Sequence, residues 1–160
     1  MIGDFAVGKT SLVARFVHRT FNDRYMTTVG VKIDTKLIQL PSGDDLKLVL
    51  WDIAGKSELA EIDTSYLRDA SGYLLVIDGT RPGGFDNALT LQTSVEQQLG
   101  PTPFCALLNK ADLTDRWLLT DGQTDTLKSR GWHFATTSAL SGAGVEEAFA
   151  ALGAQLVVDR

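Results

Sequence analysis

Residues 3–10 read Gly-Asp-Phe-Ala-Val-Gly-Lys-Thr and match the phosphate-binding pattern G-x-x-x-x-G-K-[ST]. In this pattern the glycines let backbone N–H groups curl round the β- and γ-phosphates of a nucleotide. The lysine supplies a positive charge, and the threonine hydroxyl binds magnesium. The alternative interpretation is a glycine turn that caps the following helix. Because such a match arises by chance in only about 0.5% of chains of this length, phosphate binding is favoured.

The composition is typical of an ordinary globular domain. The chain has 160 residues, of which 44% are hydrophobic and 22% are charged, so we expect a single domain over residues 1–160 with a buried core. A net charge of −5 argues against a nucleic-acid partner, because neutralising a phosphate backbone needs clustered Lys and Arg. The single Cys105 lies in an apolar stretch, which predicts a buried thiol and a reducing, cytoplasmic location.

Apolar runs alternate with segments of helical spacing, a pattern that predicts a mostly parallel sheet covered by helices. The expected strands are Val31–Leu40, Leu46–Asp52, Tyr73–Asp78, Phe104–Asn109 and Trp132–Ala135. The expected helices are Lys9–Arg19, Leu59–Leu67, Phe85–Leu99, Asp121–Arg130 and Val145–Val157. A Pro-Ser-Gly-Asp turn at residues 41–44 predicts that the first two of these strands form an antiparallel hairpin.

Three further motifs follow predicted strands. Residues 52–55, Asp-Ile-Ala-Gly, offer a carboxylate for a magnesium-bound water and a glycine N–H for a γ-phosphate. Residues 109–112, Asn-Lys-Ala-Asp, offer a carboxylate that can accept hydrogen bonds from the N1–H and amine of guanine, which adenine cannot supply. Residues 137–139, Thr-Ser-Ala, offer a small residue whose backbone N–H can approach the guanine oxygen. Each motif alone is also explained by a polar turn, but all four in this order favour a guanine-nucleotide site.

These ordered motifs resemble those of the Ras-like small GTPases, and Gly3 to Val157 is most similar to the Rab-like branch. The resemblance implies an α/β fold of the P-loop NTPase type, a three-layer sandwich whose mostly parallel six-stranded sheet has one antiparallel strand. It implies a switch that binds GTP or GDP with Mg²⁺, hydrolyses GTP to GDP and phosphate, and signals through segments 21–34 and 52–68. Its partners would be guanine nucleotide and unidentified effector, exchange-factor and activating proteins.

The resemblance also assigns residues to the site. Thr28 would reach magnesium only in the triphosphate state, Phe21 would lie against the guanine edge, and Lys110 would pack its stem along the base. Phe21 has an alternative interpretation as a core aromatic at the end of a helix. The implied nucleotide-binding residues are Gly3, Asp4, Phe5, Ala6, Val7, Gly8, Lys9, Thr10, Ser11, Phe21, Thr28, Gly55, Asn109, Lys110, Asp112, Ser138 and Ala139. The implied magnesium ligands are Thr10, Thr28 and Asp52, and the implied catalytic residues are Lys9, Thr28, Gly55 and Lys56.

Two departures from the family affect hydrolysis. Lys56 stands where the family has the glutamine that orients the attacking water, and an ammonium group has no acceptor for that water. Phe5 stands where a glycine or another small residue is usual, and it would crowd the space that an arginine finger must enter. We therefore expect slow hydrolysis; the alternative is a GTP-binding interaction module with little or none. The interpretation favoured for Lys56 and Arg24 is an exposed loop charge, and the alternative for each is an approach to the γ-phosphate that compensates for the missing groups.

The ends of the chain carry two expectations. No apolar run approaches the roughly 20 residues that a membrane span needs, and no cysteine lies near the C-terminus, so we expect no direct membrane anchor. Rab-like proteins without lipid tails occur in bacteria, which is the source that this feature favours. Only Met1 and Ile2 precede the first motif, although the resemblance implies a central strand there. We therefore expect the chain to be a fragment that lacks about six to eight upstream residues.

Overall fold

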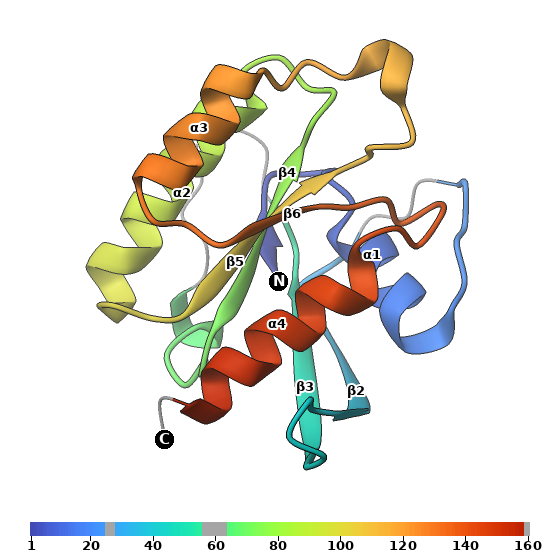
Figure 1. Ribbon diagram of the computed structural model, residues 1–160, viewed down its shortest axis with the longest axis vertical. Helices are drawn as coiled ribbons and strands as arrows, with labels where there is room; N and C mark the ends of the chain where they lie inside the picture. The colour runs from blue at the N-terminus through green and yellow to red at the C-terminus, as the bar shows by residue number, and fades with distance from the viewer. Residues whose placement is uncertain (25–27, 56–63, 159–160) are drawn as a thin grey trace.

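The computed structural model describes residues 1–24, 28–55 and 64–158 of the chain. Its strands are β1 (Ile2–Gly3), β2 (Val31–Gln39), β3 (Asp45–Ile53), β4 (Tyr73–Asp78), β5 (Phe104–Asn109) and β6 (Phe134–Thr136). Its α-helices are α1 (Lys9–His18), α2 (Gly84–Leu99), α3 (Asp121–Ser129) and α4 (Val145–Val158). Short 3₁₀ turns occupy Thr64–Tyr66 and Thr114–Arg116. Strands and helices thus alternate through most of the described chain, as the sequence pattern predicted (Figure 1).

The strands form two ladders that meet at the first residue. Strands β1, β4, β5 and β6 form a four-stranded sheet in the order β1-β4-β5-β6, with every pair parallel. Strands β2 and β3 form an antiparallel pair in register from Val31↔Ile53 to Gln39↔Asp45. The backbone N of Met1 donates to Trp51 O at 2.8 Å, and Ile53 N donates to Met1 O at 3.4 Å. The expected six-stranded sheet is therefore a four-stranded ladder joined to a hairpin, because the strand between them is only two residues long.

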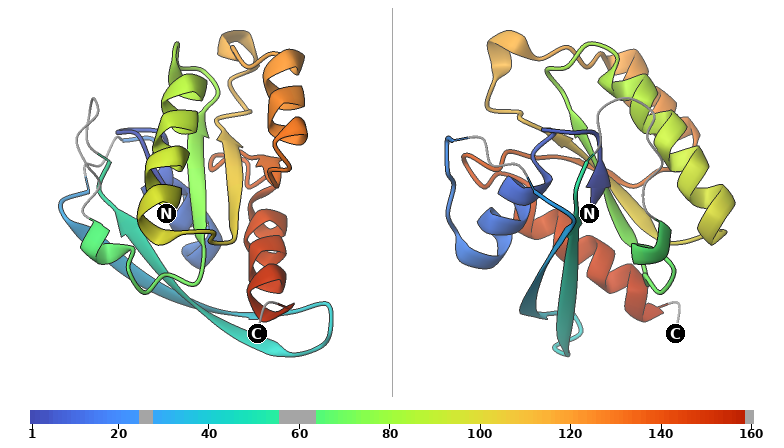
Figure 2. Two further views of the ribbon diagram at one scale, coloured as in Figure 1. Left: turned by 90° about the vertical axis from the view of Figure 1, so that its left-hand side faces the viewer. Right: turned by 180° about the vertical axis from the view of Figure 1, so that it is seen from behind.

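Helices cover both faces of the four-stranded sheet. Helices α1 and α4 lie on one face, and α2 and α3 lie on the other (Figure 2). Alternate side chains of β4 and β5 enter the two cores, as a strand period of two requires. Leu74 and Leu107 join the α1/α4 core, whereas Leu75 and Leu108 join the α2/α3 core. This arrangement leaves the carboxyl ends of β1, β4 and β5 open beside the loop that begins α1.

The hairpin β2–β3 is fixed to the helices on the α1/α4 face. Its turn is closed by Leu40 N donating to Asp44 O at 2.8 Å. Lys36 Nζ donates to Phe16 O at 2.5 Å and lies 2.8 Å from Glu146 Oε1, so one side chain links β2 to α1 and α4. A Cβ added to Gly153 of α4 would lie 3.1 Å from Leu46 Cδ2 of β3. The predicted hairpin is thus confirmed, and glycine on α4 allows its close approach.

Two predicted elements need correction. The predicted helix Leu59–Leu67 falls partly on residues 59–63, outside the described residues. Its described remainder is a 3₁₀ turn at Thr64–Tyr66, and the chain turns again directly afterwards, where Ala70 N donates to Leu67 O. The last strand begins at Phe134 rather than Trp132, since Trp132 N donates to Leu127 O at the end of α3. Within residues 1–24, 28–55 and 64–158, the structure has no helix with the length and apolar character of a membrane span.

Candidate functional site

The loop between β1 and α1 packs closely against the ends of β4 and β5. Gly3 and Gly8 have φ angles of +151° and +106°, where residues with a Cβ are strained. A Cβ at Gly3 would lie 2.6 Å from Val76 O, and one at Gly8 would lie 2.3 Å from Asn109 Nδ2. Ala6 between them has a φ of +59°, an unfavourable conformation that this loop imposes. Both glycines of the first motif are therefore required by the backbone path.

Lys9 is the first residue of α1, where helix N–H groups point outward without intrahelical partners. Its side chain curls back, and Nζ donates to Gly3 O at 2.9 Å and to Asp4 O at 2.7 Å. Burial lowers the pKa of Lys9 to about 8, although the nearby carboxylates of Asp52 and Asp4 oppose this shift. A Cβ on Gly55 would lie 2.5 Å from Lys9 Nζ. The ammonium group and the Gly55 backbone thus meet at one point beside the loop.

Three oxygen-bearing side chains meet next to Lys9. The hydroxyl oxygens of Thr10 and Thr28 are 2.5 Å apart, and Thr10 Oγ1 donates to Asp52 Oδ2 at 2.5 Å. Asp52 is the penultimate residue of β3 and is 1% exposed. Its Oδ1 is buried without a hydrogen-bond partner among the described residues, an arrangement that is costly unless a cation or water completes it. Two hydroxyls and a carboxylate are hard oxygen donors of the kind that Mg²⁺ prefers, so this group fits that ion.

The Asn-Lys-Ala-Asp motif begins at the last residue of β5 and contacts the first loop from the other side. Asn109 is buried; its Nδ2 donates to Val7 O at 3.0 Å and its Oδ1 accepts from Thr137 Oγ1 at 3.2 Å. Lys110 Nζ donates to Ala6 O at 3.0 Å. These side chains therefore hold the loop between β1 and α1 against the segments that follow β5 and β6.

Asp112 and Ser138 form the far end of the site. Ser138 Oγ donates to Asp112 Oδ1 at 2.7 Å, and Ser138 itself is buried. Ala139, which follows it, is 4% exposed. Because one oxygen of Asp112 is held by the serine, the carboxylate has a fixed orientation and still has lone pairs for a further partner.

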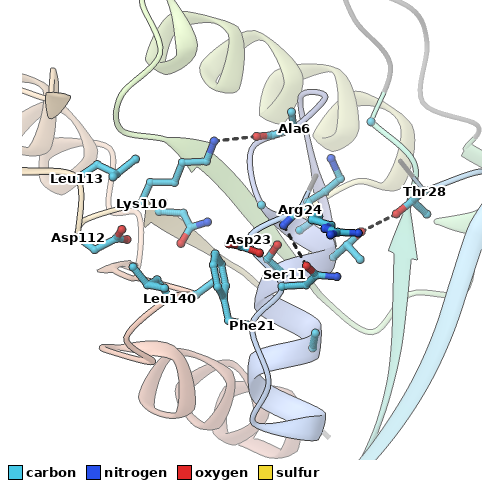
Figure 3. Close-up of a pocket in the computed structure, with 18 of the residues that line it drawn as sticks. Ala6, Ser11, Phe21, Asp23, Arg24, Thr28, Lys110, Asp112, Leu113 and Leu140 are labelled. Atoms are coloured by element: carbon cyan, nitrogen blue, oxygen red, sulfur yellow. Dashed lines mark hydrogen bonds between the residues drawn. The ribbon is translucent and has the colours of Figure 1, made fainter. Parts of the chain in front are cut away.

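These segments surround one cavity of about 460 Å³. Asp112, Leu113 and Leu140 lie at one end of it and Thr28 at the other, with Lys110 above and Phe21 below in the view of Figure 3. The lining residues with an expected role are Phe5, Ala6, Gly8, Lys9, Thr10, Ser11, Phe21, Arg24, Thr28, Gly55, Asn109, Lys110, Asp112 and Ala139. The cavity has the size of a small-molecule site.

Some expected residues lie apart from the cavity lining. Each of them contacts a lining residue through a hydrogen bond described above. They are Gly3, Asp4, Val7, Asp52 and Ser138. Phe21 is 38% exposed, so its alternative interpretation as a core aromatic is wrong. Lys56 lies outside the described residues, as do residues 25–27 of the first segment and 56–63 of the second.

Asp78 was not expected in the site, although it ends an otherwise apolar strand. Its Oδ2 lies 2.8 Å from Lys110 Nζ, and its Oδ1 accepts from the backbone and hydroxyl of Thr80 at 2.9 and 2.7 Å. Burial acts to raise the pKa of Asp78, but the hydrogen bonds from Lys110 and Thr80 outweigh it and lower the pKa below its usual value. A charged residue at the end of a buried apolar run is the signal that points to this contact.

Comparison with known proteins agrees with this geometry. The Ras family matches residues 1–157. The chain belongs to the Ras family. This Ras-family chain is 34% identical over 160 residues to Ras-related protein Rab-13 of Bos taurus. The matched region covers 99% of the chain and 78% of that protein. It is 35% identical over 159 residues to Ras-related protein Rab-8B of Homo sapiens, covering 98% of the chain and 76% of that protein.

A third relative comes from a yeast. The GTP-binding protein ypt2 of Schizosaccharomyces pombe is 35% identical over 158 residues, covering 98% of the chain and 78% of that protein. The predicted family and Rab-like similarity are thus confirmed, and so is the α/β fold class. As a member of this family the chain is a GTP-binding switch protein.

Proposed function

We propose that this chain binds GTP or GDP with Mg²⁺, hydrolyses GTP slowly to GDP and phosphate, and signals through segments 21–34 and 52–68. One observation supports the proposal above all: separate chain segments supply a cation at one end of a single cavity and a carboxylate at the other. A nucleotide has the complementary polarity, with phosphates at one end and hydrogen-bond donors on the base. The partners would be effector, exchange-factor and activating proteins that sense the two segments.

The phosphates would occupy the end beside Lys9. The lysine now donates to two backbone carbonyls of its own loop, so it is held next to the place where a phosphate would replace them as acceptors. The N-terminus of α1 adds unpaired N–H groups and the positive end of the helix dipole. Gly55 would offer its N–H to the terminal phosphate from the opposite side.

Magnesium would be held by Thr10, Thr28 and Asp52. The Oδ1 of Asp52, which has no hydrogen-bond partner in the described parts of the chain, supports this assignment, since a buried carboxylate oxygen needs a cation or a donor. When bound, the ion supplies charge that neutralises the phosphates during transfer. Thr28 precedes the second half of the first segment, so its hydroxyl would couple that segment to the state of the nucleotide.

The base would occupy the end beside Asp112. The carboxylate would accept hydrogen bonds from the N1–H and amine of guanine, while Ser138 keeps it oriented. The stem of Lys110 and the ring of Phe21, on opposite sides of the cavity, would enclose the base between them (Figure 3). Adenine has a hydrogen-bond acceptor at N1 and no amine at C2, so it would leave the carboxylate unpaired.

Nucleotide identity provides the direct test. The protein is purified without added nucleotide, denatured, and its bound nucleotide is identified by chromatography. We expect GDP or GTP in near-stoichiometric amount, displaced by added GDP and not by ADP. A chain that carries no guanine nucleotide and binds neither GDP nor GTP in the presence of Mg²⁺ would contradict the proposal.

The rate of hydrolysis separates a slow enzyme from a binding module. Lys56 provides no acceptor for the attacking water, so we expect Lys56→Gln to raise single-turnover phosphate release from bound GTP by an order of magnitude or more. Lys47→Gln, a matched change at an exposed lysine of β3, should leave the rate unchanged. An equal rate in wild type and Lys56→Gln would refute this account of Lys56, and no measurable release in either protein would favour the binding module.

A further inference from the structure

Arg15 connects α1, at the phosphate end of the cavity, to the loop of residues 137–144, which joins β6 to α4 at the base end. It lies on α1, six positions after Lys9, and is half-buried. Its Nε donates to Ala139 O at 2.7 Å, and its Nη2 donates to Leu140 O. A Cβ on Gly142 would lie 3.5 Å from Arg15 Cδ, so the stem of the arginine also contacts this loop. One rigid, planar guanidinium group thus binds two successive carbonyl groups.

The other hydrogen bonds of this loop are made within the loop, to β5 and the residues that follow it, and to the start of α4. Ser138 N donates to Ala143 O at 3.0 Å, Gly142 N donates to Ser138 O at 2.8 Å, and Ser138 Oγ donates to Asp112. Within the described parts of the chain, the hydrogen bonds between this loop and α1 are those of Arg15. The arginine therefore supplies the hydrogen bonds that orient the loop on the helix that begins with Lys9, beside the apolar packing of Ala139 in the α1/α4 core.

The contact has a consequence for the direction of one N–H group. In a trans peptide the C=O of one residue and the N–H of the next point in opposite directions. Because Ala139 O faces Arg15, the N–H of Leu140 points away from the arginine. No hydrogen bond from this N–H occurs within the described residues, and both Ala139 and Leu140 line the cavity. The N–H is therefore available to a hydrogen-bond acceptor on a bound base.

We propose that Arg15 is a positioning residue for recognition of the purine carbonyl group: by holding Ala139 O and Leu140 O, it aims the Leu140 N–H at the carbonyl oxygen of the base. This inference rests on the proposed function, since it concerns the same guanine-nucleotide site. It adds a determinant of base preference on α1, outside the four sequence motifs.

The test compares GDP with 6-thioguanosine diphosphate in wild type, Arg15→Gln, Arg15→Lys and the matched control Arg130→Gln. The thio analogue keeps the N1–H and amine but has sulfur, a weaker acceptor, in place of the carbonyl oxygen. Dissociation constants are measured by titration calorimetry with Mg²⁺, on protein whose folding is checked by circular dichroism. We expect wild type and Arg130→Gln to prefer GDP about five- to tenfold, the worth of one hydrogen bond.

In Arg15→Gln this preference should fall to within about twofold, and Arg15→Lys, which keeps one charged donor, should be intermediate. If Arg15 had a merely structural role, Arg15→Gln would weaken the binding of both nucleotides by the same factor and leave the preference for GDP intact, which would overturn the inference. A wild type that binds GDP and 6-thioguanosine diphosphate equally well would also overturn it. If Arg15→Gln does not fold, an unchanged preference in Arg15→Lys would overturn it and a reduced one would support it. Failure of wild type to bind either nucleotide would instead refute the proposed function.

Discussion

The substitution Asp112→Asn should change the base that the chain prefers. The Asp112 side chain offers one oxygen to Ser138 Oγ at 2.7 Å, and an asparagine keeps that acceptor through its carbonyl oxygen. The second oxygen becomes an NH₂ group, which donates and cannot accept. Guanine presents donors at this edge and would meet another donor, whereas xanthine has a carbonyl in place of the amine and would meet a partner. The variant should therefore lose guanine nucleotides and gain xanthine nucleotides.

The magnitude follows from two hydrogen bonds to a carboxylate. Each is worth about 1.5–3 kcal/mol when protected from solvent, but Asp112 is exposed, so the lower end applies to each. A total of about 3 kcal/mol corresponds to a loss of roughly 100-fold in GDP affinity. Competition of GDP, xanthosine diphosphate and ADP against a fluorescent nucleotide measures the three affinities. The matched change Asp115→Asn, three residues further along, should leave them unaltered. GDP affinity within threefold of wild type in Asp112→Asn would refute the assignment of the base end.

Two further predictions concern stability. Phe16 stacks on Phe149 with ring centroids 3.9 Å apart in the α1/α4 core, so Phe16→Ala should lower the free energy of unfolding by about 3–5 kcal/mol in a urea titration. The pKa of Asp78 is lower in the folded chain than its ordinary value of 3.8, so the ionised carboxylate stabilises the fold at pH values above 3.8. This stabilisation is lost as the pH falls through the lower pKa of the folded state. Asp78→Asn should thus be less stable than wild type near pH 7, and the difference should shrink at low pH; a constant difference would contradict the role of the Lys110 contact.

Periodic elements were predictable because each pattern has one structural solution. The short apolar run at residues 73–77 of β4, preceded by a glycine, indicates a strand buried on both faces, and the alternation of β2 and β3 around a Pro-Ser-Gly-Asp turn indicates a hairpin. Element ends were harder, since they depend on which backbone groups a neighbour takes. Gly131, with a φ of +71°, indicates the end of α3, but the sequence did not indicate that Trp132 N also donates back to Leu127 O, and this bond moves the start of β6 to Phe134.

The site was predictable where a motif carries its own chemistry and obscure where tertiary contacts supply it. Lys9 and Asp112 belong to sequence patterns with a chemical reason for each residue. Arg15 and Asp78 belong to no such pattern; their partners lie 124 and 32 residues away, and only folding brings them together. The roles assigned to the motif residues remain predictions, and the variants above test them.

The register of the hairpin has a consequence for variation in chain length. Asp52 lies at the end of β3 and owes its burial to a pairing that begins at Gln39↔Asp45. Side chains alternate between faces, so loss or gain of one residue between the turn and Trp51 would turn Asp52 away from Thr10. Loss or gain of two residues would preserve the alternation, and a change of length within residues 41–44 would leave the pairing of the two strands untouched. Natural insertions and deletions in relatives of this chain should therefore gather in that turn and otherwise come in pairs.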